Sequence, residues 1–131
     1  MNDRLGELGS SELEVLRALW ERGPSTVRDV LAHLQERGRR VAYTTVLTFL
    51  SRLEQKGFAS SNKSGLAYIY RAMVTRDRVS RSKIKSLLSE LYDGAAGPLV
   101  LQLMQNERLT PDEIQELQKL LGRLEGEATE Q

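Results

Sequence analysis

The chain has 131 residues, of which 40 % are hydrophobic and 28 % are charged, and it contains no cysteine. This length accommodates one domain, or one domain with an appendage. Without cysteine, disulfide bonds, thiol nucleophiles and cysteine metal sites are excluded. No apolar run is long enough to cross a bilayer and no secretory signal is visible, so we expect a cytoplasmic protein without membrane insertion.

The formal net charge is only +1, but the charges are unevenly distributed along the chain. Residues 1–92 hold 16 lysines and arginines against 10 acidic residues, whereas residues 93–131 hold 3 against 8. Residues 37–85 alone hold 12 basic and 2 acidic side chains. Such a basic segment is the electrostatic footprint of a polyanion partner, and a merely solvated basic face is the alternative.

Two amphipathic helices are predicted ahead of the basic segment. The first covers residues 11–22, where Ser11 and Glu14 have the spacing of a capping box. The second begins at Ser25 or Thr26, either of which is a suitable N-cap. Their apolar stripes consist of Leu13, Leu16, Leu19 and Trp20, and of Val27, Val30, Leu31 and Leu34.

Residues 42–56 are predicted to form a third helix with two different faces, because a helix advances about 100° per residue. Val46, Phe49, Leu50 and Leu53 lie on its apolar side. The other side carries hydroxyl side chains and almost no acid, and cations border it. Hydroxyl and methyl groups can contact base edges, and cations can contact phosphates. We therefore predict a recognition helix for the major groove of DNA.

Ten residues in and around this helix are expected to bind DNA. Those expected to face bases are Tyr43, Thr44, Leu47 and Thr48, and Thr45 belongs to the same DNA-binding set without an assigned contact. Those expected to face phosphates are Arg39, Arg40, Arg52, Lys56 and Lys63.

A β-hairpin is predicted after the third helix. Residues 58–62 and 67–71 have the pattern of short strands, with a turn at 63–66 between them. Three short helices followed by a hairpin are typical of a winged helix-turn-helix domain, to which we assign residues 1–73. Lys63 at the hairpin tip would contact a phosphate or a minor groove, or would only keep the sheet edge soluble.

Residues 74–126 are predicted to form a dimerisation domain of three helices: 75–92, a short and largely buried helix at 99–104, and one capped by Thr110. So few residues cannot bury their many apolar side chains alone, so they must pack on the first domain or on another chain. A frayed tail is expected at residues 127–131. The residues expected at the dimer interface are Ile84, Leu87, Leu88, Leu91, Leu99, Val100, Leu103, Met104, Ile114, Leu117 and Leu121.

Several stretches in this order and spacing resemble the BlaI/MecI family of penicillinase-type transcriptional repressors, from about Leu8 to Leu121. The matching stretches are Glu12-Leu13-Glu14-Val15-Leu16, Leu19-Trp20, Gly23-Pro24, Val27, Val30, Tyr43-Thr44-Thr45-Val46, Thr48, Leu50, Arg52-Leu53, Lys56-Gly57, Tyr68-Ile69-Tyr70, Leu99-Val100 and Leu117. The resemblance implies a mainly α-helical fold with a small β-hairpin wing and a C-terminal helical dimerisation domain. It also implies a homodimer that blocks transcription from a palindromic operator.

The resemblance further suggests how repression could be relieved. In better-known members of that family, a membrane sensor metalloprotease triggers cleavage within the C-terminal domain at an Asn-Phe pair. The aligned pair here is Gln102-Leu103. Some members carry basic residues at the positions of Leu47 and Thr44, so their operator sequence does not carry over to this chain.

Other functional classes fit the sequence less well. It contains no nucleophile–base pair, no glycine-rich phosphate loop and no metal-ligand set, so we expect neither an enzyme nor a cofactor. His33, the only histidine, lies off the apolar stripe of its helix and is expected on the solvated surface. The alternative function is a winged-helix module that binds protein rather than DNA. An RNA-binding protein is disfavoured because aromatic residues make up only 5 % of the chain.

Overall fold

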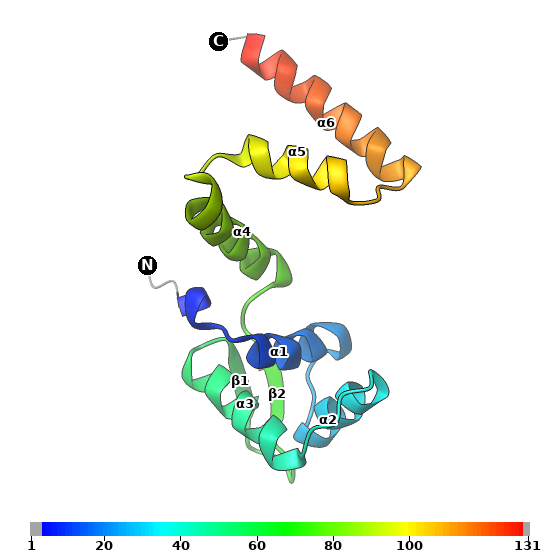
Figure 1. Ribbon diagram of the computed structural model, residues 1–131. Coiled ribbons are helices and arrows are strands. Elements are labelled where there is room, and N and C mark those ends of the chain that lie inside the picture. The colour runs from blue at the N-terminus through cyan, green and yellow to red at the C-terminus, as the bar shows by residue number, and fades with distance from the viewer. Residues whose placement is uncertain (1–3, 130–131) are drawn as a thin grey trace. The chain divides into compact units, whose positions relative to one another are not determined.

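The computed structural model describes residues 4–129 (Figure 1). It divides into two compact units, the first extending to Leu87 and the second beginning at Leu88. The division falls inside α4 (Arg76–Tyr92), not before it at residues 73 and 74 as predicted. The cause is local packing. Val79, in the first turn of α4, is buried in the core of the first unit, and the indole Nε1 of Trp20 donates a 2.8 Å hydrogen bond to the Val74 carbonyl.

The first unit has the element order of a winged helix-turn-helix domain, as predicted. A 3-10 turn, η1, precedes three helices and two strands: η1 (Arg4–Glu7), α1 (Ser10–Arg22), α2 (Val27–Glu36), α3 (Tyr43–Gln55), β1 (Ala59–Asn62) and β2 (Ile69–Ala72). The strands pair antiparallel, with Ala59 opposite Ala72 and Asn62 opposite Ile69. Ser25, in the connection between α1 and α2, adds an isolated antiparallel bridge to Tyr70.

The core of this unit is built from the apolar stripes of the three helices. Leu16 from α1, Val30 from α2, and Leu50 and Leu53 from α3 have no exposed surface. Burying a side chain of this size stabilises the fold by roughly 1.5–3 kcal/mol. These side chains therefore fix α3 by one face and leave its opposite face toward solvent.

The helix starts show which caps the chain uses. Thr26, and not Ser25, caps α2: its hydroxyl accepts from the Asp29 N–H at 3.1 Å, while its own N–H donates to the Asp29 carboxylate at 3.0 Å. The predicted Ser11–Glu14 box is wrong, because α1 begins at Ser10 and the carboxylate that accepts from its N-cap, Gly9, belongs to Glu12.

The second unit contains the end of α4, then α5 (Ala96–Asn106) and α6 (Pro111–Thr129). The predicted Thr110 cap of α6 is confirmed by reciprocal hydrogen bonds of 3.1 and 2.8 Å with Glu113. Helix α5 is longer than the predicted 99–104, because Pro98 lies in its first turn, where no N–H donor is needed. Helix α6 includes residues 127–129, which were predicted to fray, and residues 130 and 131 lie outside the described part.

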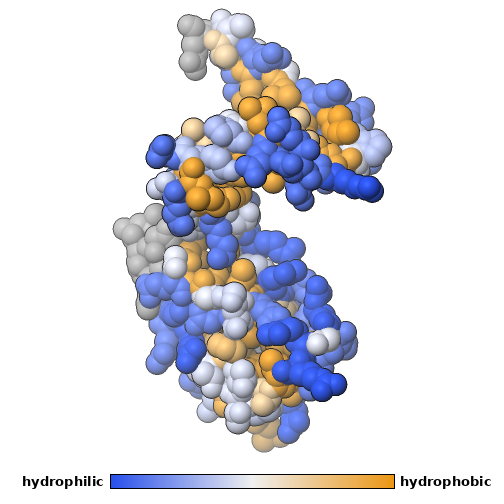
Figure 2. Space-filling model, viewed as in Figure 1, coloured by the Kyte–Doolittle hydropathy of each residue, from blue (hydrophilic) through white to orange (hydrophobic). Residues whose placement is uncertain are grey.

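The apolar side chains of α5 and α6 remain exposed in the single chain. No residue of either helix is buried, so the prediction of a largely buried segment at 99–104 is wrong for one copy of the chain. Figure 2 shows hydrophobic residues, in orange, on the surface of the part that holds these helices. None of the helices of residues 4–129 combines the length and apolar character needed to cross a bilayer.

Candidate nucleic-acid interface

Helix α3 presents a mixed hydroxyl and apolar surface to solvent. Tyr43, Thr44, Leu47 and Thr48 are exposed, whereas Thr45 is half-buried and therefore turned partly away from that surface. The Thr48 hydroxyl donates to the Thr44 carbonyl at 2.9 Å. That bond uses its only proton, so the hydroxyl oxygen can still accept a hydrogen bond and the methyl group can still make apolar contact.

Three of the five predicted phosphate contacts are cations without a carboxylate partner. Arg40, Arg52 and Lys63 are exposed, and none of them forms an ion pair with a residue in the range 4–129. The Arg52 guanidinium lies 5.6 Å from the centroid of the Phe49 ring, and Lys63 Nζ lies 5.5 Å from that of Tyr68. Aromatic contacts hold these charges near the surface without neutralising them.

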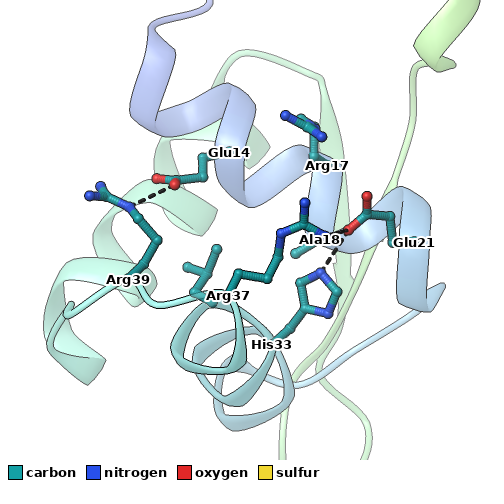
Figure 3. A pocket seen from close by; sticks show the side chains of 8 residues that line it. Glu14, Arg17, Ala18, Glu21, His33, Arg37 and Arg39 are labelled. Atoms are coloured by element: carbon teal, nitrogen blue, oxygen red, sulfur yellow. Dashed lines mark hydrogen bonds and ion pairs between the residues drawn. The ribbon is translucent and has the colours of Figure 1, made fainter.

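Arg39 is paired with an acid on α1. Its Nε lies 2.6 Å from Glu14 Oε2, and its side chain is half exposed (Figure 3). A phosphate contact by Arg39 would therefore require that it exchange the Glu14 carboxylate for a phosphate oxygen.

Lys56, the remaining predicted phosphate contact, is engaged by acceptors within the fold. Its Nζ donates to both carboxylate oxygens of Glu12, at 2.8 and 3.0 Å, and to the Glu7 carbonyl at 2.7 Å. These bonds use the three donors of the ammonium group, and the two side chains are only 21 % and 7 % exposed. A phosphate contact by Lys56 would therefore require that these bonds break, and in the single chain Lys56 joins the end of α3 to α1.

The Glu12 carboxyl is held in its charged form by this arrangement. Burial alone would raise its pKa, but the hydrogen bonds from Lys56 and from the Gly9 N–H, together with the positive charges of Lys56 and Arg52, outweigh that effect, and the pKa lies below its ordinary value. The Glu12 carboxyl is therefore ionised at neutral pH.

An open cavity of about 600 Å³ lies between α2, α3 and the wing. Its lining consists of Thr26, Val27, Arg28, Asp29, Tyr43, Leu47, Leu66, Ala67 and Tyr68. The Arg28 guanidinium lies 5.3 Å from the centroid of the Tyr43 ring. The sequence analysis missed Arg28 because it precedes the basic segment 37–85. Its position off the apolar stripe of α2, at the start of that helix, is the signal that could have identified it.

A second, smaller cavity of about 200 Å³ contains a polar cluster between α1 and α2 (Figure 3). Glu21 accepts from His33 Nε2 at 2.7 Å and from Arg37 at 3.3 Å, and Arg76 at the start of α4 lies 3.8 Å away. The hydrogen bond from His33 is the main cause that lowers the pKa of Glu21. His33 is therefore not solvated as predicted, because its side chain is only 16 % exposed.

The residues predicted for dimerisation all lie at or near the surface. Leu88, Leu99 and Leu117 are half-buried, and the other eight are exposed. Gln102 and Leu103, the predicted cleavage pair, lie inside α5, and the Gln102 amide oxygen accepts a 2.6 Å hydrogen bond from the Tyr92 hydroxyl.

Comparison with known proteins relates this chain to one protein family. The family model described as penicillinase repressor matches residues 8–123. MecI, the methicillin resistance regulatory protein of Mammaliicoccus sciuri, is 27 % identical over 123 residues, which cover 94 % of this chain and 99 % of MecI. The penicillinase repressor of Bacillus licheniformis is 26 % identical over 118 residues, covering 90 % and 91 % of the two chains.

Two solved structures are also similar, at lower sequence identity. One is BpsR of Bordetella bronchiseptica, whose structure was solved to explain how 6-hydroxynicotinic acid regulates its DNA binding. Its sequence is 21 % identical, and the TM-score is 0.46 over 91 % of this chain and 76 % of BpsR. The other is a MarR family protein of Bacillus stearothermophilus, 20 % identical, with a TM-score of 0.48 over 96 % and 83 %. The family match spans both units and confirms the resemblance. The chain belongs to the penicillinase repressor family, which is a family of transcriptional repressors and not of enzymes.

Proposed function

We propose that this repressor acts as a homodimer that occupies a palindromic operator, with α3 of each copy in the major groove. The observation that carries the proposal is the exposed surface of α3, together with the nearby cations Arg40 and Arg52 and the wing cation Lys63, none of which pairs with an acid among residues 4–129. Occupancy of the promoter by the dimer would block transcription.

Base reading is assigned to the exposed side chains in the first half of α3. Thr44 and Thr48 can hydrogen-bond to base edges, and Leu47 can pack against a thymine methyl group. Tyr43 stands at the start of the same surface. Because Leu47 cannot donate a hydrogen bond to guanine, we expect an A·T pair opposite it.

Dimerisation is assigned to the second unit. The exposed apolar residues include Leu91 on α4, Val100 on α5 and Leu121 on α6, and no residue from 4 to 129 buries them. A second copy would bury these surfaces by a two-fold operation, which also duplicates the recognition helix. Two-fold related helices bind half-sites about one helical turn, roughly 34–36 Å, apart or at a multiple of that distance.

The test begins with selection of a duplex from a random pool by the full-length protein. Gel-shift titration of that duplex, and of versions whose half-sites are moved apart by a few base pairs, should show binding that depends on spacing. Sedimentation velocity should give the mass of two chains at micromolar concentration. A monomer that binds no duplex at low salt would refute the proposal and favour the alternative, a protein-interaction module.

Relief of repression by proteolysis between Gln102 and Leu103 is part of the same proposal. Cleavage there would separate α6, with Ile114, Leu117 and Leu121, from the rest of the dimer surface. Because the bond lies inside α5, a protease would have to unwind that helix first. Co-expression with a candidate membrane sensor metalloprotease, followed by mass measurement, should yield fragments that end at 102 and begin at 103. Intact chain under inducing conditions would contradict it.

A further inference from the structure

The cavity between α2, α3 and the wing is continuous with the proposed base-reading surface, because Tyr43 and Leu47 belong to both. A DNA strand whose bases lie against the first half of α3 must also pass its sugar–phosphate backbone close by. The cavity is the open space beside those two residues, and the wing residues Leu66, Ala67 and Tyr68 form its other wall.

The lining is chemically complementary to a sugar–phosphate chain. Apolar carbon from Leu66 and the Tyr68 ring suits the deoxyribose, and Arg28 supplies a cation for a phosphate. Asp29 is the one acid among the described lining residues, and its carboxylate accepts a hydrogen bond from the Thr26 N–H at 3.0 Å as part of the helix cap.

Arg28 is held in place without being neutralised. Its guanidinium stacks over Tyr43 at 5.3 Å, and it forms no ion pair with any residue from 4 to 129, in contrast to Arg37 and Arg39. A stacked guanidinium retains its N–H donors and has already lost much of its rotational freedom, so little entropy remains to be lost when a phosphate binds.

We propose that this cavity receives the backbone of one operator strand and that Arg28 binds one of its phosphates, an inference that rests on the proposed function. Arg28 is then a positioning residue: it carries no base information itself, but it sets how α3 and Tyr43 lie against the duplex. The wing cation Lys63, stacked on Tyr68 of the opposite wall, would contact the same strand farther along.

The experiment measures binding of full-length wild type, Arg28→Ala and Arg28→Lys to the selected duplex by fluorescence anisotropy across salt concentrations. Arg28→Ala should bind about tenfold more weakly, as expected for a charged hydrogen bond. Its log K against log salt plot should be shallower by about 0.9, the value for one phosphate contact. Arg28→Lys should keep the wild-type slope. Arg17→Ala, which removes an exposed arginine of α1, is the charge-matched control and should keep it too.

Single methylphosphonate substitutions along the duplex locate the contact. One position should weaken wild type and Arg17→Ala but leave Arg28→Ala unaffected, because its partner is already gone. If every position weakens Arg28→Ala as much as wild type, the inference is overturned while the repressor proposal stands. If wild type shows no salt-dependent binding to any duplex, the proposed function itself fails.

Discussion

Lys56 Nζ lies 2.8 Å from Glu12 Oε1, and this ion pair joins the residue that ends α3 to the first turn of α1. The two residues are 44 positions apart in the chain. The same ammonium also reaches the Glu7 carbonyl, so η1, α1 and α3 meet at one group. The position of the recognition helix along its own axis therefore depends on a contact at the end farthest from its proposed base-reading residues.

Replacing Lys56 by alanine should destabilise the fold more than it changes DNA contacts. Removal of the cation leaves Glu12 buried without its partner, and we expect a loss of roughly 3 kcal/mol in the free energy of unfolding, measured in urea. Arg52→Ala is the matched control, and we expect the reverse: stability within about 0.5 kcal/mol and a shallower salt dependence of DNA binding. Equal stability of the two variants would contradict the role of Lys56.

The same pair predicts a pH dependence of stability. The pKa of Glu12 is lowered in the folded chain, so its stabilisation is fully present above the ordinary carboxyl pKa of 4.5 and is lost as the pH falls through the lower folded value. Urea unfolding from neutral pH into acid should therefore show a decline that is less steep in Glu12→Gln. Part of the decline should remain, because the pKa values of Glu21 and Asp29 are lowered as well.

Neutralising Glu14 should strengthen DNA binding. Glu14→Gln removes the carboxylate that holds Arg39, so a phosphate no longer has to displace it, and we expect affinity to rise by about two- to fivefold, the equivalent of an exposed ion pair. Fluorescence anisotropy with the selected duplex measures the change. The double variant with Arg39→Ala should lose the gain. A gain that persists in the double variant would show that Arg39 is not its source.

Leu47 should determine the preference at one base pair of each half-site. Leu47→Ala shortens the side chain that is proposed to pack on a thymine methyl, and each methylene withdrawn from such a contact is worth about 0.8 kcal/mol. Selection from a random pool should recover the wild-type motif with a relaxed preference at that position only. An unchanged motif would place Leu47 away from the bases.

A charge introduced on the apolar surface of α6 should dissociate the proposed dimer. Leu121 is 51 % exposed in the single chain, and Leu121→Glu would place an unpaired carboxylate in the proposed interface. Sedimentation velocity should then give a single-chain mass, and operator affinity should fall sharply. Gln118→Glu, at an exposed polar site of the same helix, adds the same charge as a control. A Leu121→Glu protein that sediments like wild type would exclude α6 from the interface.

The helices and the wing were predictable from the sequence because their signals are local. The stripe of Val46, Leu50 and Leu53 recurs at helical spacing, and all three side chains are buried as that spacing requires. The partners of Lys56 and Arg39 were not predictable, because Glu12 and Glu14 come from a helix distant in the chain. A lysine at the end of an amphipathic helix has the same pattern whether it faces a phosphate or a buried acid.

The periodicity of the sequence also could not predict which neighbouring surface would bury the apolar side of α5. A segment such as 99–104 has the composition of a core helix, yet in one chain its side chains are exposed. Hydrophobicity predicts that a surface becomes buried, but it does not distinguish a neighbour in the same chain from one in a second copy.

The wing is fixed only at its base. Ser25 exchanges backbone hydrogen bonds of 2.8 and 2.9 Å with Tyr70, and the strand pairing ends at Asn62 and Ile69. Residues 63–68 lie beyond this ladder and contribute nothing to the buried core. Insertions or exchanges in this loop should therefore cost little stability. Related repressors could diverge at this loop to acquire new preferences for operator flanks, and a designer could retarget the protein there without repacking its interior.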